Sequence, residues 1–298
     1  MLTVVLGLIG ALAYGSADFA GGLASRRRHP VFVTTLTATI GIVPLLIGLT
    51  VLGGRFTADA FLWGTVAGLS GSVGVLLLYA ALATGPMSVL SPLTSVFTAV
   101  VPVLVAVALG TRLAVPALDA IVAAIVAVVL VSATRDTTGT RVTLRGLLMA
   151  ATSGCGFAGL VLAYDMTSPR DGIAPLVVAR VVQAILMAAT LLFTVARARA
   201  HASGTPVGLP RTHGMGRRFW MLVVTCGVLD ATANIFIQAA LHSSTDPSTL
   251  PVVSVLTALY PVGTIVLAGI VLRERLTRLQ IGGIGLGIAA SVVLALVG

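Results

Sequence analysis

The sequence contains no lysine, and all 18 of its basic residues are arginines. A Walker-type nucleotide loop and Schiff-base chemistry both require a lysine side chain, so its absence excludes both. The four histidines lie in or beside expected loops, and the sequence shows no Ser/His/Asp set or cluster of metal ligands. We therefore expect a protein that is not an enzyme, with no catalytic residues, no cofactor and no metal.

Cysteine is also scarce. The two cysteines, Cys155 and Cys226, both fall inside long apolar runs. Two such residues provide neither a disulfide framework nor a metal site. We expect both to be small, buried core residues.

Charged residues make up only 9% of the 298 residues, whereas about 25% is usual for a soluble domain. The mean hydropathy is +1.10. A bilayer-spanning helix needs ~20 mostly apolar residues, and the sequence contains ten such runs, the first of which we expect to be retained rather than cleaved as a signal. We predict an all-α polytopic membrane protein, multi-pass in the lipid bilayer of a bacterial inner membrane, with spans at 2–24, 31–53, 60–83, 88–110, 114–133, 144–165, 173–196, 219–241, 248–271 and 279–297.

Two segments of the chain resemble each other. Residues 79–113 and 238–272 share 13 identities in 35 positions without a gap, including matched prolines, serines and threonines. This offset places the third and fourth expected spans over the eighth and ninth, so the repeated unit has five helices. Because five is odd, the second unit enters the membrane in the opposite orientation, which is a signature of secondary transporters. We predict two inverted five-helix repeats, 1–137 and 138–298, around a central cavity.

The repeated segment also carries a family resemblance. Residues 78–110, "LYAALATGPMSVLSPLTSVFTAVVPVLVAVALG", resemble the third-to-fourth-span signature of the drug/metabolite transporter superfamily, EamA-like branch. Residues 272–294, "LRERLTRLQIGGIGLGIAASVVL", resemble the last loop and helix of that family. One departure is that the acid Glu274 has no counterpart in the first half. The resemblance implies export of small metabolites or drugs and names no substrate.

Arginines are distributed unevenly over the expected loops. The loops after the first, third, fifth, seventh and ninth spans hold 3, 0, 3, 5 and 3 arginines, whereas the opposite loops hold only Arg55, Arg112 and Arg170. Because arginine-rich loops favour the cytoplasm, this bias predicts that both termini are outside. The ten-span relatives look the other way round, so the orientation stays open. A membrane-surface role accounts for the arginines, and we expect no nucleic-acid partner.

Three polar residues line one face of the eighth expected span. Asp230, Asn234 and Gln238 are spaced by four, so they stack along the helix. The stripe is either the lining of a cavity that binds a polar substrate or a proton, or a set of interhelical hydrogen bonds. The carboxylate near mid-span favours the cavity, because ionisable groups at that depth usually face a partner or a water-filled space.

Two further ionisable residues lie inside expected spans. Asp18 follows Tyr14 by four residues. It is either a second coupling acid or substrate-amine ligand, with Tyr14 as hydrogen-bond partner, or a carboxylate that snorkels to the interface at Arg26–Arg28 or pairs with an arginine there. Arg180, with Gln183 one turn on, can hold an anionic substrate group or a carboxylate, or reach back to the headgroups.

The fourth and ninth expected spans carry hydroxyls and prolines at matched positions. Singly, a Ser or Thr often bonds its own helix backbone, but together the matched residues indicate the paired central helices of a binding site. A proline frees one backbone carbonyl and permits a kink, so two of them are hinge candidates, although fixed curvature is the alternative. The binding candidates are Ser95, Thr98, Ser254 and Thr257, and the hinge candidates are Pro102 and Pro261.

We interpret the other notable residues as structural. Gly64 and Gly68 form a small-xxx-small pair that permits close helix packing. Tyr79 and Tyr260 are more readily explained as core filling than as cavity lining. Asp119, Asp165 and Asp171 lie at span ends and are expected to be solvated.

The pattern as a whole predicts a secondary transporter. No loop is long enough for a nucleotide-binding domain, so transport must be secondary or passive. We expect alternating access that moves a small polar or amphipathic metabolite or drug outward, with protons as the candidate coupling ion through Asp230 and Asp18, in a monomer or homodimer. The alternative is a lipid-handling or membrane-scaffold protein whose intramembrane polar residues are structural.

Overall fold

The structure is a computed structural model that describes residues 1–84, 87–132, 143–201, 216–271 and 277–297. These residues form helices, joined by short turns and one isolated β-bridge between Gly54 and Gly172. The expected repeat boundary at 137/138 and the acid Glu274 lie outside the described residues. The helices are α1 (Leu2–Ser25), α2 (Pro30–Leu52), α3 (Ala58–Thr84), α4 (Met87–Ala108), α5 (Val115–Ser132), α6 (Leu144–Asp165), the 3-10 turn η1 (Pro169–Asp171), α7 (Ala174–His201), α8 (Arg217–Leu241), α9 (Thr249–Thr257), α10 (Tyr260–Val271) and α11 (Arg278–Val297).

The helices follow the apolar runs of the sequence. Six of those described, α1, α2, α3, α6, α7 and α8, are long and apolar enough to cross a membrane. Their outer faces carry large apolar side chains such as Leu46, Ile185 and Leu192, which are exposed as expected where lipid replaces water. The chain is therefore a helical multi-pass membrane protein, while the count of ten spans stays a prediction.

The ninth apolar run differs from the prediction of a single helix. It forms two helices, with α9 ending at Thr257 and α10 beginning at Tyr260. Pro261 has no N–H to donate to the carbonyl one turn earlier, which removes a helical hydrogen bond at this point. In α4, by contrast, Pro102 lies within a continuous helix.

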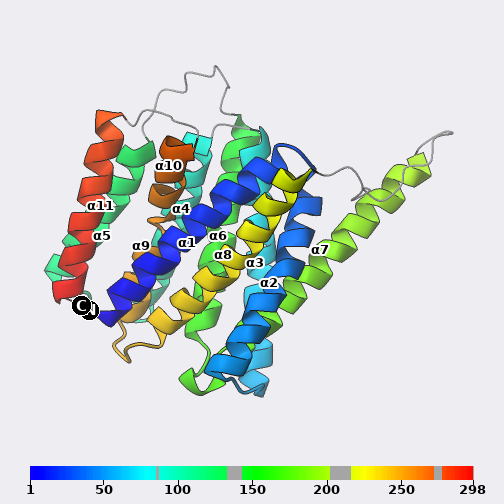
Figure 1. Ribbon diagram of the computed structural model, residues 1–298. Helices are drawn as coiled ribbons and strands as arrows, with labels where there is room; N and C mark the ends of the chain where they lie inside the picture. Colours follow the sequence, from blue (N-terminus) through cyan, green and yellow to red (C-terminus); the bar gives the residue numbers. More distant parts are fainter. Residues whose placement is uncertain (85–86, 133–142, 202–215, 272–276, 298) are drawn as a thin grey trace.

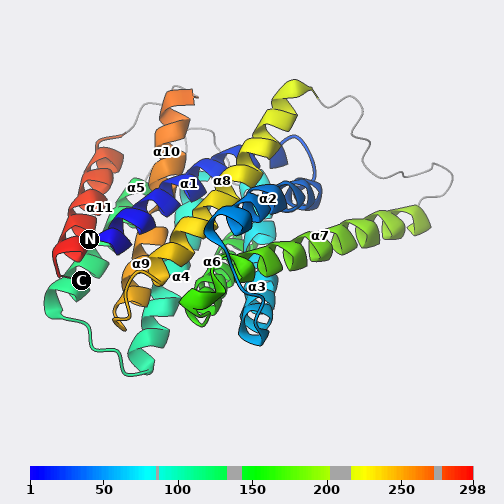
Figure 2. The same cartoon turned by 60° about the horizontal axis from the view of Figure 1, so that its bottom comes forward.

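The helices pack in pairs that join distant parts of the sequence. Among them, α1 packs along α8, α3 along α6 and α7, α2 along α7 and α8, and α5 along α11. Helix α4 packs on α6 and α9, and α1 packs on α10. Figure 1 shows both termini at the same end of the bundle, with α5 and α11 together at one edge, and Figure 2 shows the same pairing from below.

Helices approach each other most closely at glycines, which have no side chain. A Cβ on Gly15 would overlap the carbonyl oxygen of Tyr260, so glycine lets α1 lie against the junction of α9 and α10. The Thr264 hydroxyl donates to the Gly15 carbonyl at 2.9 Å. A Cβ on Gly68 would lie 2.6 Å from the Ala179 carbonyl oxygen, as expected for close packing of α3 on α7.

The two cysteines lie in different environments. Cys226 is fully buried in α8, where its thiol and the hydroxyl of Tyr79 are 3.0 Å apart. Cys155 is exposed on α6, so the expectation that it would be buried is wrong. On a membrane-spanning helix, a small apolar thiol is accommodated on the outer face as readily as in the core, because lipid tails are also apolar.

The basic ends of the helices gather at one end of the bundle. In Figure 1 the ends of α1 and α7 and the starts of α6 and α8 lie at the end opposite the two termini. Arg26 to Arg28 follow α1, Arg145 lies in the first turn of α6, and Arg217 and Arg218 begin α8. The predicted asymmetry of arginines is therefore also an asymmetry in space, although it leaves the orientation in a membrane as a prediction.

Candidate functional site

An ion pair lies inside the helix bundle between α7 and α8. The guanidinium of Arg180 donates to a carboxylate oxygen of Asp230, and through its other terminal nitrogen to Gln183 Oε1 at 2.7 Å. The two charged side chains are only 7% and 18% exposed. Burial of charge is costly unless the charge is paired and hydrogen-bonded, and here each charge has a partner.

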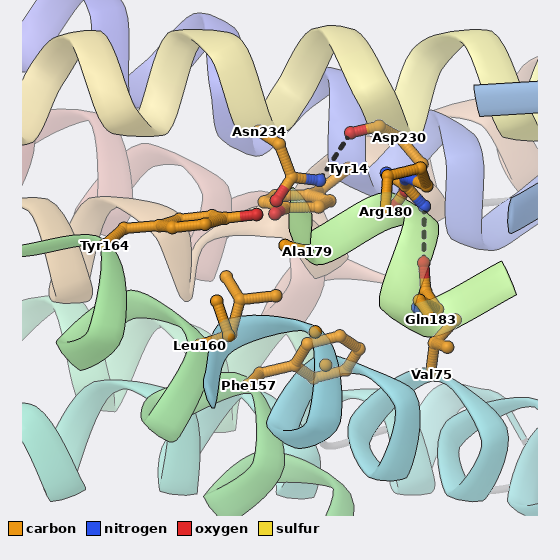
Figure 3. Close-up of a pocket in the computed structure, with 13 residues that line it drawn as sticks. Tyr14, Val75, Phe157, Leu160, Tyr164, Ala179, Arg180, Gln183, Asp230 and Asn234 are labelled. Atoms are coloured by element: carbon orange, nitrogen blue, oxygen red, sulfur yellow. Dashed lines mark hydrogen bonds and ion pairs between the residues drawn. The ribbon is translucent and has the colours of Figure 1, made fainter. Parts of the chain in front are cut away.

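The amide of Asn234 lies beside this pair, one turn along α8. Its Nδ2 donates to the backbone carbonyl of Asp230 at 2.7 Å. Its Oδ1 is buried and has no hydrogen-bond partner among the described residues. Figure 3 shows this amide next to the side chains of Tyr14 and Tyr164. The site therefore contains an amide oxygen that can still accept a hydrogen bond.

Two adjoining hollows surround these groups. Each has a cavity volume of about 20 Å3, and they share Tyr14, Phe157, Leu160 and Asp230. The first is also lined by Ala67, Gly68, Gly71, Val75, Tyr164, Ala179, Arg180, Gln183 and Asn234 (Figure 3). The second is also lined by Asp18, Thr98, Val161, Thr257 and Tyr260. Helices from both halves of the chain therefore meet around one polar centre.

Asp18 lines the second hollow and is only 7% exposed. The alternative that it pairs with the Arg26–Arg28 cluster is wrong, because those arginines are exposed at the end of α1 and form no ion pair with it. Tyr14 lines the same hollow, but no hydrogen bond joins the two side chains. Asp18 has neither a hydrogen bond nor an ion pair within the described part of the chain.

The polar stripe on α8 divides into two parts. Asp230 and Asn234 line the first hollow, whereas Gln238 is buried near the end of the helix and donates to Thr167 Oγ1 at 3.3 Å. Thr167 Oγ1 in turn lies 3.3 Å from His242 Nε2. The spacing of four is thus correct for the shared helix face, but Gln238 connects helix ends instead of lining the site.

The matched hydroxyls mostly bond their own helices. Thr98, Ser254 and Thr257 donate to the carbonyls of Thr94, Leu250 and Val253. Thr98 and Thr257, which are equivalent positions of the sequence repeat, nevertheless line the same hollow, whereas Ser95 and Ser254 are fully buried outside both hollows. Tyr260 also lines this hollow, and its hydroxyl donates to the Ser91 carbonyl at 2.9 Å.

Asp171 differs from its expected role. It is 1% exposed instead of solvated, because its carboxylate accepts from the Thr57 hydroxyl at 2.9 Å and from the Ser168 N–H at 3.0 Å. Its own backbone carbonyl accepts from the Arg55 N–H, and Gly54 and Gly172 form the β-bridge. The Ser-Pro-Arg-Asp sequence is a capping box, and that signal could have identified the role of Asp171.

Outside the spans, two loop residues have shifted proton affinities. Partial burial lowers the pKa of His242, with hydrogen bonds to the carbonyls of Thr167 and Tyr164 acting in the opposite direction. The backbone N–H of Ser248 donates to Asp246 and lowers the pKa of that carboxyl. No group of three or more possible metal ligands is found within the described ranges.

Phe157, Leu160 and Tyr164 line the site without having been predicted. They lie on α6, which carries neither a charged residue nor an amide in its central turns. Aromatic and aliphatic residues are frequent in every membrane span, so their type alone gives no signal. Only the packing of α3 on α6, which turns this face toward the centre, identifies them.

The comparisons with known proteins agree on the fold. No curated protein matches the chain, whereas 29 chains of solved structures do. One crystal structure superposes with a TM-score of 0.71 over 99% of this chain and 96% of that chain at 16% sequence identity, a likeness that shows the fold alone. The profile of the EamA-like transporter family matches residues 1–133 and again residues 144–296. Two matches that together span nearly the whole sequence show that the chain belongs to the EamA-like transporter family, a family of drug/metabolite transporter type.

Proposed function

We propose that this protein is a secondary transporter built from two inverted five-helix repeats that cross the membrane ten times. The helix pairing supports this arrangement. If α1 to α5 correspond to α6, α7, α8, α9–α10 and α11, the α1–α8 contact becomes the α6–α3 contact, and α2–α8 becomes α7–α3. The α4–α6 contact likewise becomes α9–α10 on α1. A twofold relation of this kind is typical of transporters that bind substrate at the repeat interface.

The observation that carries the proposal is the polar centre of the bundle. Arg180 and Asp18 are buried among apolar helices and Asp230 is only 18% exposed; ionisable groups are costly there and mark ion or substrate pathways. The hollows around them are lined by helices of both halves. The proposed activity is alternating access that exports a small polar or amphipathic metabolite or drug through this centre, in a bacterial inner membrane and by a monomer or homodimer.

We also propose that transport is coupled to protons, and the ion pair is the observation that supports this coupling. In this proposal a proton that reaches Asp230 neutralises the carboxylate, and the ion pair that joins α7 to α8 is lost. Loss of a proton restores the pair. Asp230 is therefore the proposed coupling residue, with Asp18 as the second acid of the same centre.

The test begins with identification of the transported compound. Intracellular and extracellular metabolites are compared between cells that express the protein and cells that do not, and the compound that moves is assayed in proteoliposomes with an imposed pH gradient. We expect Asp230→Asn to abolish gradient-driven exchange, whereas Asp119→Asn, on the exposed face of α5, retains it. Unchanged exchange by Asp230→Asn would reject the coupling role.

The folded state of the variants separates transport from structure. Asp230→Asn leaves the Arg180 charge buried without a counter-charge, so the double variant Arg180→Gln/Asp230→Asn is measured beside it. We expect the double variant to be folded and inactive. If both variants lose folded protein and the wild type moves no compound, the polar residues are structural and the alternative of a lipid-handling or scaffold protein is favoured.

A further inference from the structure

Two hydrogen-bond acceptors that line the central hollows, the Asp18 carboxylate and Asn234 Oδ1, have no partner among the described residues. Arg180, the one basic residue in the described lining, already donates to Asp230 and to Gln183. An anionic substrate would have to displace a carboxylate that is covalently held in place. The guanidinium is thus the counter-charge of Asp230, and it is poorly suited to be the primary site for an anion.

The acceptors, in contrast, lack partners. Asn234 Oδ1 is buried in a side chain that is 4% exposed, and no described residue donates to it. Asp18 is 7% exposed, and its carboxylate has no hydrogen bond or ion pair within the described ranges. A buried polar group without a partner is unfavourable, and a buried carboxylate needs either a proton or a cation to compensate its charge. Both groups belong to the adjoining hollows, where a ligand can supply the missing donor.

The walls next to these acceptors are aromatic. Tyr14, Phe157 and Tyr260 line the hollow that contains Asp18, and Tyr164 lines the hollow that contains Asn234. Aromatic faces attract ammonium groups and do not attract carboxylates, and the attraction increases where water is excluded. Charge and wall chemistry therefore favour the same kind of ligand.

We propose that the central site recognises a small organic ammonium ion, with Asp18 as its counter-charge, Asn234 Oδ1 as a hydrogen-bond acceptor and the aromatic side chains as its walls. Arg180 and Asp230 neutralise each other, so an ionised Asp18 leaves the centre with one uncompensated negative charge. This inference rests on the proposed transport function, since it names the class of substrate for the same site.

Three probes with the same aromatic ring but different charge test the assignment. Binding of phenethylamine, 2-phenylethanol and phenylacetate to the purified full-length protein in lipid nanodiscs is measured by calorimetry at pH 7.5. We expect phenethylamine to bind at least about tenfold more tightly than the other two, as expected for one charge-assisted hydrogen bond. Tighter binding of phenylacetate, equal binding of all three, or binding of none would overturn the assignment.

Variants then locate the counter-charge. Asp18→Asn, which keeps the side-chain shape, should weaken phenethylamine binding at least about tenfold, whereas the exposed Asp119→Asn should bind as the wild type does. If Asp18→Asn does not fold, Asn234→Leu is the second variant, and we expect it to weaken binding several-fold. Wild-type affinity in a folded Asp18→Asn protein would overturn the role of Asp18.

The binding assay is independent of transport. A site that prefers phenylacetate would reject the ammonium assignment and leave the proposed transporter intact, because gradient-driven exchange of another compound would still be observed. Conversely, a protein that binds phenethylamine through Asp18 but exchanges no compound in proteoliposomes would retain the assignment of the site and reject the transport proposal.

Discussion

The central helices of the two halves differ although their sequences are related. Helix α4 continues through Pro102, whereas the equivalent run in the second half is interrupted before Pro261 and forms α9 and α10. A proline therefore does not decide by itself whether a helix is interrupted. At the second junction α1 lies against the interrupted segment through Gly15, and Thr264 donates to the Gly15 carbonyl.

The polar groups are even less alike than the helices. At the offset of 159 residues that relates the repeats, Asp230 corresponds to Gly71, so the ion pair exists in one half only. The first half instead contributes Asp18, which lacks an ionic partner among the described residues. The difference teaches that both halves line the hollows, while the ionisable residues of the polar centre occur once and are not duplicated.

Of the changes that test this comparison, removal of Arg180 should have the largest effect on stability. Arg180→Leu leaves Asp230, which is 18% exposed, without a counter-charge, and we expect destabilisation by about 3–5 kcal/mol. The loss of stability is measured by heating the purified protein and determining the remaining folded fraction by size-exclusion chromatography. Asp18→Asn, in the other half, removes no ion pair and should unfold near the wild-type temperature. Equal losses in the two variants would show that the halves do not differ in this way.

The close glycine contacts offer the second comparison. A Cβ on Gly154 in α6 would overlap the carbonyl oxygen of Thr94 in the continuous α4, just as a Cβ on Gly15 would overlap Tyr260. Overpacking of this kind costs about 1–3 kcal/mol. We expect Gly154→Ala to lose more thermal stability than Gly15→Ala, because the interrupted segment can shift and the continuous helix cannot. The reverse order would contradict this view of the two segments.

Pro102 and Pro261 can be compared through the exchange rates of their alanine variants. Pro261→Ala restores a donor at the junction and favours a continuous helix, so it should raise the barrier to rearrangement by about 1 kcal/mol and slow exchange roughly fivefold. Pro102→Ala, in a helix that is already continuous, should leave the rate nearly unchanged. Initial rates of exchange in proteoliposomes provide the measurement, and similar rates for the two variants would argue against a hinge at Pro261.

The smallest expected effect is on the pH dependence of stability, through His242 in the loop between α8 and α9. Because burial lowers the pKa of His242 in the folded protein, the unfolded chain binds a proton more readily. Stability is then highest above the ordinary pKa of histidine and falls as the pH drops through it. The difference in melting temperature between pH 7.5 and pH 5.5 should be smaller in His242→Gln than in the exposed control His29→Gln. No difference between the variants would remove His242 as a source of acid sensitivity.

Helix positions were largely predictable because the apolar runs are long. The sixth expected span coincides with α6, and most other ends differ by only a few residues. The ninth run was the exception, since whether a proline kinks or interrupts a helix depends on the neighbouring helices. The candidate site residues were selected by another signal, the rarity of ionisable groups in apolar runs, which pointed to Asp18, Arg180 and Asp230.

Partners across helices were not predictable. The sequence places Arg180 and Asp230 on separate helices, and their contact depends on how α7 and α8 each pack on α2. The same limit explains why Gln238 was grouped with the site and why Asp171 was expected to be solvated. In each case the residue type was informative, but the face it meets was determined by residues far away in the sequence.

The connection at Asp171 has a mechanical consequence. It joins the turn between α2 and α3 to the turn between α6 and α7 through the Thr57 hydroxyl, the Arg55 N–H and the Gly54–Gly172 bridge. Four helices, two from each half, are thus fastened at one point near an end of the bundle. A rocking motion of the halves preserves these bonds only if its axis passes close to that point, which makes the joint a fulcrum for any movement that leaves it intact.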